Sequence, residues 1–270
     1  MKPHNFDSYR NKYESITLTR TDDGILEVRL HAPGDPTKHI TYGDRPYGWD
    51  HPHCEWSHCF NDIARDYENE VVIITGTGDT FVDKHVGADI SMVGSVPPLD
   101  PKDADPIFMN SMMVHDNLMR IPVPVIGAVN GPAHTHAEVA VMSDIVICAE
   151  HALFADQPHF PSGIFMPGDS VAMVWPLLLG ENRGREFLLT GREIPAEEAL
   201  RLGVVSEVLP LPRLLPRAYE LARDLLKRPK LVRRYTRQLF MHKWQAEMQG
   251  HLGYGQALEW LAAAGRELRK

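Results

Sequence analysis

Histidine is the residue type whose number first points to chemistry in this sequence. The chain holds 14 His, more than its 8 Tyr or 9 Phe, and imidazole is the side chain best suited to proton transfer near neutral pH. His159 and Asp169 occupy loop segments that lead into a predicted helix, so both side chains can face one cavity. A His–Asp pair activates water, because the carboxylate orients the imidazole and stabilises the imidazolium that forms.

A second concentration of polar ligands lies in the first quarter of the chain. It consists of His51, His53, Cys54, His58 and Cys59, and imidazole and thiolate are ligands that zinc prefers. The group lacks the paired Cys-x-x-Cys or His-Glu-x-x-His spacing of established zinc motifs. We therefore predict no metal in this protein.

Composition and charge narrow the class of protein. Hydrophobic residues make up 43% of the 270 residues and charged residues 24%, which is enough apolar material for a large core. The 36 acidic residues outnumber the 28 Lys and Arg, for a formal net charge of −8. A chain of that sign repels nucleic acid phosphates and anionic lipid, so we expect neither as a partner.

Cysteine content and hydropathy predict the compartment. Three cysteines, an odd number in a chain of this size, favour reduced thiols over a disulfide framework. The first residues contain no apolar run of the signal-peptide type, and no apolar stretch approaches the ~20 residues that span a bilayer. We expect a soluble cytoplasmic protein.

The first two thirds of the chain show the pattern of an α/β protein. Alternating segments at 15–20 and 25–30 predict a β-hairpin. Continuous apolar runs at 71–76, 124–131 and 144–150 predict strands that are buried on both faces. Helical patterns, including 54–67 and 107–119, separate these strands, as expected for a parallel sheet.

Helices dominate from Asp169 onward. We expect them at 171–179, 184–189, 196–202, 214–227, 230–249 and 254–268, with one short strand at 204–209. The last two are long and rich in Arg, Gln and Met, a composition that suits packing across a subunit boundary as well as onto a core.

Four sequence blocks carry a resemblance to a known family. They are VVIITGTGDTFVDKHVGADI (71–90), PVPVIGAVNGPAHTHAEVAVMSDIVICAE (122–150), FADQPHFPSGIFMPGDS (154–170) and LLTGREIPAEEALRLGVVSEVLP (188–210). In this order they resemble the crotonase (enoyl-CoA hydratase/isomerase) superfamily. The resemblance implies an α/β fold, a crotonase-like spiral of ββα repeats over residues 1–200. It also implies a helical C-terminal trimerisation region over 201–270, and assembly as a homotrimer or a dimer of trimers.

Departures from the superfamily pattern fall in its catalytic loops. Members that use acyl-CoA hold the thioester enolate with two backbone N–H groups, one of them in a glycine-rich loop. Here that loop reads PAHTHA (132–137), and the loop after Phe81, which carries the other donor, is also altered. Glu138 matches the first glutamate of the hydratases, but His159 stands where the second would be. The resemblance therefore does not extend to hydration by two carboxylates.

Within the superfamily, these substitutions resemble the 6-oxocamphor hydrolases, which are β-diketone hydrolases. The resemblance places the catalytic base on His159, its aspartate partner on Asp169 and the carbonyl-binding histidine on His136. It places the C-terminal active-site glutamate on Glu259. The expected substrate-binding residues are Trp49 and His53, with Tyr42 as an alternative to Trp49 and His134 as an alternative to His136.

These residues predict hydrolysis of a carbon–carbon bond in a small-molecule diketone, cyclic or bicyclic, by a retro-Claisen reaction that gives a keto acid. No cofactor is required, because the second carbonyl stabilises the departing carbanion. Two alternatives remain open at this stage. One is a CoA-ester hydratase, isomerase or hydrolase, and the other is a catalytically inactive crotonase-fold binding or RNA-associated module.

Overall fold

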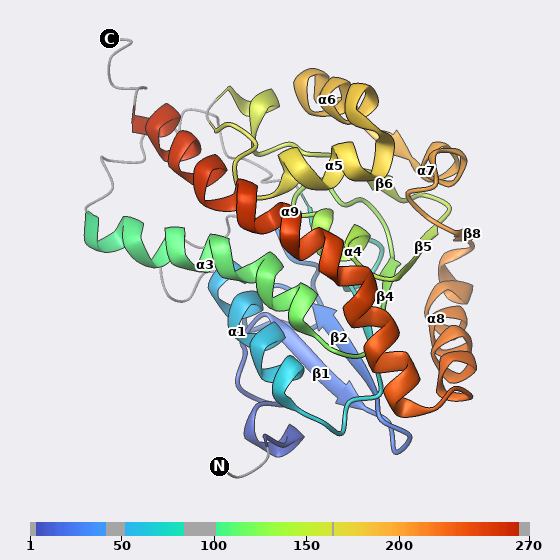
Figure 1. The fold of residues 1–270 in the computed structure, drawn as a ribbon. Helices are drawn as coiled ribbons and strands as arrows, with labels where there is room; N and C mark the ends of the chain where they lie inside the picture. Colours follow the sequence, from blue (N-terminus) through green and yellow to red (C-terminus); the bar gives the residue numbers. More distant parts are fainter. Residues whose placement is uncertain (1–3, 42–51, 84–100, 164, 265–270) are drawn as a thin grey trace.

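The computed structural model describes residues 4–41, 52–83, 101–163 and 165–264 (Figure 1). Its described part is built around a six-stranded sheet in the order β1-β2-β3-β4-β5-β8. The strands are β1 (Ile16–Arg20), β2 (Ile25–Leu30), β3 (Val71–Thr75), β4 (Val125–Val129), β5 (Ile145–Ala149) and β8 (Glu207–Leu209). The sequence predicted each of these strands, and they are confirmed.

Strand direction follows from the connections. β1 and β2 are antiparallel and are joined by a tight turn in which Gly24 adopts φ +83°, a conformation that favours glycine. All later neighbours are parallel, with Ile73 opposite Ile126 and Ile126 opposite Ile145. Such pairs require crossover connections, and helices supply them. The predicted α/β class with a mainly parallel sheet is therefore confirmed.

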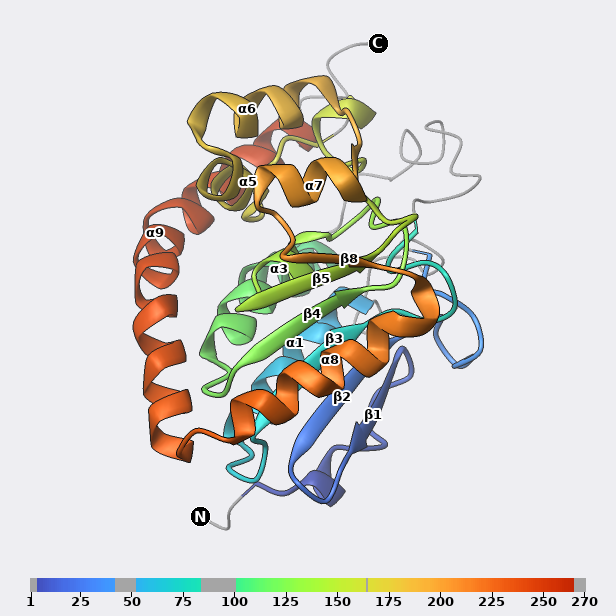
Figure 2. The ribbon, with the colours of Figure 1, turned by 90° about the vertical axis from the view of Figure 1, so that its right-hand side faces the viewer.

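Helices cover both faces of the sheet (Figure 2). On one face, α8 (Leu211–Leu226) packs Leu214, Ala218 and Ala222 against strand residues such as Ile73 and Ile126. On the other face lie α1 (Pro52–Arg65), α3 (Pro101–Arg120) and the short α4 (Glu138–Val141). The strands are consequently apolar on both sides, which explains their continuous hydrophobic runs.

The remaining elements lie around this layered core. They are η1 (Phe6–Ser8), β6 (Leu153–Phe154), η2 (Phe160–Ser162), α5 (Val171–Leu179), α6 (Glu181–Thr190), β7 (Ile194–Pro195), α7 (Ala196–Leu202) and α9 (Lys230–Ala264). β6 and β7 form a separate two-stranded antiparallel sheet. α9 crosses α3 and reaches α5 (Figure 1).

The prediction of two C-terminal helices, 230–249 and 254–268, was wrong. One continuous helix, α9, runs from Lys230 to Ala264. Glycine inside a helix costs about 1 kcal/mol relative to alanine, so the glycines between 250 and 255 favoured a break. Tertiary packing offsets this cost, because Met248 and Leu252 are buried and Gly255 lies against the backbone of Gly168.

Residues after position 200 complete the same core as those before it. β8 pairs with β5, and α8 covers one face of the sheet. The division into a core at 1–200 and an oligomerisation region at 201–270 stays a prediction, as does the trimer.

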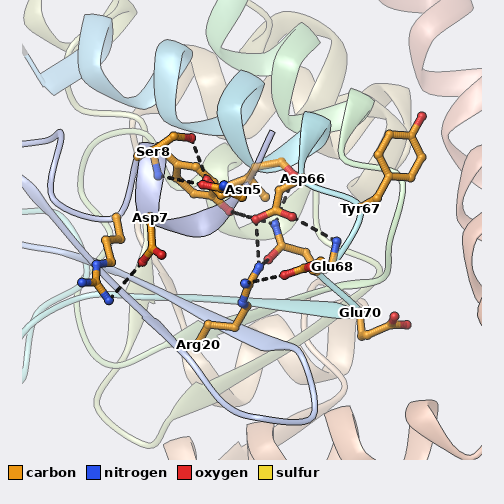
Figure 3. Close-up of polar contacts among 12 residues, drawn as sticks. Asn5, Asp7, Ser8, Arg20, Asp66, Tyr67, Glu68 and Glu70 are labelled. Atoms are coloured by element: carbon orange, nitrogen blue, oxygen red, sulfur yellow. Dashed lines mark hydrogen bonds and ion pairs between the residues drawn. The ribbon is translucent and has the colours of Figure 1, made fainter. Parts of the chain in front are cut away.

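A polar network ties the N-terminal segment to the turn after α1 (Figure 3). The buried carboxylate of Asp66 accepts hydrogen bonds from the Tyr9 hydroxyl at 2.9 Å and from Arg20 at 2.8 Å. Arg20 also contacts Glu68 at 3.0 Å. These contacts hold β1 and the segment before it against the α1–β3 connection.

No helix in the described ranges combines the length and the apolar character needed to cross a membrane.

Arg237 fastens α9 to the rest of the fold. Arg237 is 2% exposed, and its guanidinium donates to the carbonyl oxygens of Leu118 at 3.1 Å and Ile121 at 2.7 Å, at the end of α3. It also pairs with Asp144, which in turn accepts from the backbone N–H of Val125 at 2.7 Å. One side chain therefore joins α9, α3 and the start of β4.

We expect Arg237→Ala to lower the free energy of unfolding by about 3–5 kcal/mol, because it leaves a largely buried carboxylate and two carbonyls without their partner. Chemical denaturation at fixed protein concentration measures this. Arg213→Ala is the control, since that exposed ion pair is worth less than about 1 kcal/mol. Equal effects of the two substitutions would contradict the assigned role of Arg237.

Candidate active site

Two aspartates flank His159. Its Nδ1 forms a hydrogen bond of 2.6 Å with Oδ1 of Asp156, which precedes it by three residues. Its Nε2 lies 3.6 Å from Oδ1 of Asp169. All three side chains are buried. Asp156 therefore fixes the orientation of the ring, while Asp169 lies beside the nitrogen that remains for chemistry.

The charges around His159 favour its protonated form. Burial alone would lower the pKa of His159, but Asp156 and Asp169 outweigh it and raise that pKa well above the usual range. Burial raises the pKa of Asp156, against the effect of His159. The two carboxylates thus hold a proton on the imidazole until the pH exceeds its ordinary titration range.

Glu259 extends this group from the C-terminal helix. Burial, with Asp169 as the next contributor, raises the pKa of Glu259 to about 8. The backbone N–H of Gly168 and the Gln256 side chain, at 3.4 Å, interact with its carboxylate. A carboxyl group with this pKa exchanges a proton near neutral pH.

A close backbone contact brings α9 to the loop before α5. A Cβ atom added at Gly168 would lie 2.4 Å from the carbonyl oxygen of Gly255, and one added at Gly255 would lie 2.3 Å from the carbonyl oxygen of Gly168. Only glycine fits at either position. Because Gly168 precedes Asp169 and Gly255 lies one turn before Glu259, this contact sets the approach of the two carboxylates.

His136 occupies an unusual backbone conformation. Its φ is +52°, in the left-handed region that non-glycine residues rarely adopt. This is the loop that is glycine-rich in the CoA-using members of the superfamily. Such strain persists where the surrounding structure imposes it, frequently at functional sites. The imidazole Nδ1 lies 2.6 Å from Oε1 of Glu138.

Glu138 joins His136 to a second buried histidine, His115. The Nε2 of His115 lies 3.5 Å from the same Glu138 oxygen, and its Nδ1 lies 3.0 Å from Oγ of Ser170. Burial alone would raise the pKa of Glu138, but His136 and His115 outweigh it and hold that pKa well below the usual range. Glu138 is therefore an ionised carboxylate inside the protein.

His53, on α1, lies beside His136 in the site. Its ring centroid lies 4.7 Å from that of His136, and its Nδ1 lies 3.2 Å from Oγ of Ser111. One ligand atom each from His53, His136 and Asp169 lies within 4.8 Å of the others. Asp169 thus connects the two histidines with the His159 group.

The structure brings together five of the residues predicted from sequence, namely His159, Asp169, His136, Glu259 and His53. Their catalytic and binding roles stay predictions. Trp49 and its alternative Tyr42 lie outside the described residues. His134 is directed elsewhere, toward Asp83 at 3.0 Å and Glu193 at 3.7 Å.

Sequence reasoning missed Asp156 and His115. Asp156 had a local signal, because it precedes His159 by three residues in the same loop. His115 had none, because it lies within the ordinary amphipathic pattern of α3.

The early cysteines do not gather at this site. Cys54 and Cys59 are buried and are in no disulfide, and His58 is exposed on α1. Burial raises the pKa of the Cys59 thiol well above its usual range. Thiolate ligation is therefore disfavoured at this position.

An apolar cavity of about 190 Å³ borders the site between α5 and α9. Gly168 and Ser170, which flank Asp169 in sequence, belong to its wall, together with Met173, Met248 and Leu252. Its lining suits a hydrocarbon framework rather than a charged group.

Comparison with known proteins identifies the family of this chain. The family model described as "Enoyl-CoA hydratase/isomerase" matches residues 52–258. A carnitinyl-CoA dehydratase from Salmonella arizonae is 33% identical, over 81% of this chain and 77% of that protein. The fatty acid oxidation complex subunit alpha of Shewanella baltica is 28% identical over 82% of this chain, and the chain spans about 30% of that subunit.

Two solved structures match nearly the whole chain. A beta-diketone hydrolase from the cyanobacterium Anabaena sp. PCC 7120, bound to (S)-3-oxocyclohexyl acetic acid, is 38% identical. It covers 100% of this chain and 99% of its own, with a TM-score of 0.84. An enoyl-CoA hydratase/isomerase from Mycobacterium paratuberculosis shares the fold, at 22% identity, 94% and 95% coverage and a TM-score of 0.79. Because the family model matches well over half of the chain, the chain belongs to the enoyl-CoA hydratase/isomerase family and is an enzyme of the crotonase superfamily.

Proposed function

We propose that this enzyme hydrolyses a carbon–carbon bond of a cyclic or bicyclic β-diketone by a retro-Claisen reaction and releases a keto acid. The observation that carries the proposal is the buried His159, held between Asp156 and Asp169 and linked through Asp169 to His136. This reaction requires a general base and a hydrogen-bond donor for the carbonyl oxygen, close to each other in one site.

The first step is attack of water on one carbonyl carbon. Neutral His159 takes a proton from water at Nε2, and Asp156 stabilises the resulting imidazolium through Nδ1. The carbonyl oxygen becomes an oxyanion, and His136 donates to it from the ring edge opposite Glu138. Donation from Nε2 requires the imidazolium form of His136, and the ionised Glu138 stabilises its positive charge at Nδ1. A donor of this kind lowers a barrier by roughly 3–4 kcal/mol.

The second step breaks the bond between the attacked carbonyl carbon and the carbon between the two carbonyls. The electron pair moves onto that central carbon and is delocalised as the enolate of the second carbonyl. The new carboxylic acid and the enolate are the immediate products, and a proton returned to the central carbon gives the ketone. Glu259, with a pKa of about 8, is a suitable donor because half of it is protonated near that pH.

Two further observations support a diketone of this shape. The cavity whose wall includes Gly168 and Ser170, the sequence neighbours of Asp169, is small and apolar and suits a compact carbocycle, while His159, His136 and His53 lie outside its wall. The Anabaena β-diketone hydrolase was solved with (S)-3-oxocyclohexyl acetic acid. A cyclohexanone that carries an acetic acid group at C3 is the keto acid that water produces from a bicyclic eight-carbon 1,3-diketone.

A CoA-ester hydratase, isomerase or hydrolase is the second candidate function. The relationship to a carnitinyl-CoA dehydratase, at 33% identity, favours it. The replacement of the second glutamate by His159 opposes it, as does a histidine at the position of the glycine-rich loop.

We expect the purified protein to convert the bicyclic 1,3-diketone whose ring opening gives 3-oxocyclohexyl acetic acid. In water enriched in ¹⁸O the new carboxylate gains one labelled oxygen, because water is the nucleophile. Chromatography with mass detection measures both product and label. Turnover of an enoyl-CoA, together with no turnover across a panel of cyclic diketones, would favour the second candidate.

Replacement of the base gives the next test. His159→Ala should lower kcat/KM for the diketone by about 10²–10⁴-fold, the usual contribution of a general base. His58→Ala, at an exposed position on α1, should retain full activity. If His159→Ala keeps wild-type kcat/KM while its thermal unfolding is normal, His159 is not the base.

The pH profile follows from the sign of the pKa shift. A base must be deprotonated, and the pKa of His159 is raised, so kcat/KM should increase with pH and level off only above neutrality. Asp156→Asn removes one charge that raises this pKa and should move the rising limb to lower pH. The pH profile is measured with a chelator present, so that trace metal ions do not bind the histidines and alter it.

The Glu259→Gln variant identifies the group whose titration gives the rising limb of the pH profile. The rising limb should persist in this variant if it reports the titration of His159. Its disappearance would mean that Glu259 acts as the base, which would contradict the roles proposed for both His159 and Glu259.

A further inference from the structure

The group formed by His53, His136 and Asp169 has the chemistry of a metal site. One ligand atom from each lies within 4.8 Å of the other two, and all three side chains are buried. His53 lies on α1, His136 lies in the loop after β4, and Asp169 lies two residues before the start of α5. Because they are far apart in sequence, no motif indicates them.

The surroundings of the two histidines resemble the support that metal ligands receive. A histidine that binds a metal through one nitrogen usually hydrogen-bonds a carboxylate, carbonyl or hydroxyl group through the other. Nδ1 of His136 contacts Glu138 at 2.6 Å, and Nδ1 of His53 contacts the Ser111 hydroxyl at 3.2 Å. A metal would therefore bind both rings through Nε2 without disturbing these contacts.

We propose that His53, His136 and Asp169 bind one Zn²⁺ ion, and that the bound ion inhibits the enzyme. Two imidazoles and one carboxylate are a ligand set that zinc accepts with a fourth position open. Tetrahedral donors at zinc lie about 3.4 Å apart, so shifts of about 1 Å bring these side chains into place.

A second group, His115, His136 and Glu138, also has its ligand atoms within 4.8 Å. Binding there would break the hydrogen bond between His136 and Glu138, because Glu138 would become a ligand. Binding at the first group keeps that bond as support, and for this reason we assign the ion to His53, His136 and Asp169.

Inhibition rests on the proposed function. In that mechanism His136 binds the carbonyl oxygen and Asp169 lies beside Nε2 of His159, and zinc would withdraw both side chains from these positions. Binding itself does not depend on the function, so the two are measured separately.

Zinc binding is tested by calorimetry on the metal-free protein without substrate. We expect one equivalent to bind with micromolar or lower Kd, and Co²⁺ in its place to give the visible bands of a four-coordinate ion. His53→Ala and Asp169→Asn should each weaken binding at least tenfold. His58→Ala, on an exposed turn of the same helix, should bind as the wild type does.

Three results would overturn the assignment. They are no saturable binding, unchanged affinity in both His53→Ala and Asp169→Asn, and loss of binding in Glu138→Gln with normal binding in Asp169→Asn. Thermal unfolding of each variant confirms that it is folded.

Inhibition is then measured at free zinc concentrations set by a metal buffer, because β-diketones chelate the ion. Diketone turnover should fall by half near the calorimetric Kd and recover with a chelator. Turnover that is unaffected by saturating zinc would refute the inhibition, and absent turnover with normal zinc binding would refute the proposed function alone.

Discussion

The backbone contact between Gly168 and Gly255 controls how the C-terminal helix meets the loop before α5. Each glycine leaves less than 2.5 Å between an added Cβ and the other's carbonyl oxygen. Any side chain at either position would push the two elements apart. The contact lies next to Asp169 on one element and one turn from Glu259 on the other. The separation of these carboxylates, and through Asp169 the surroundings of His159, therefore depends on it.

Burial makes this arrangement electrostatically sensitive. Asp156, Asp169 and Glu259 bring three carboxyl groups around a single imidazole, and like charges at such distances raise one another's pKa. The protein lowers the cost by keeping protons on His159 and on Glu259, whose pKa is about 8. Glu259 thus gains or loses a proton near neutral pH, whereas His159 loses its proton only at a pH above its ordinary range. The same proximity that is costly for stability supplies the proton donors and acceptors for chemistry.

Hydrophobic pattern predicted most of the fold, because a strand buried on both faces leaves an unbroken apolar run. It failed at α9, where glycine propensity indicated a break and contacts with a distant loop overrode it. The site was predicted from positions at which His159 and His136 replace other residue types in a family pattern. Asp156 and His115 do not stand at positions where the family pattern has another residue type, so only their proximity to the site in three dimensions identifies them. Nor does sequence spacing show that His53 lies beside His136, because their contact joins a helix to a loop far along the chain.

The substitution of side chains for backbone donors changes what the shared fold can do. A backbone N–H stabilises an oxyanion throughout the physiological pH range, because it keeps its proton there. In the proposed mechanism His136 takes the place of such a donor, and Glu138 holds its orientation. A ring nitrogen, unlike a backbone N–H, is also a metal ligand. A thioester enolate needs strong stabilisation from the protein throughout its lifetime. A β-diketone delocalises the departing electron pair onto its own second carbonyl, so a titratable donor is sufficient for it.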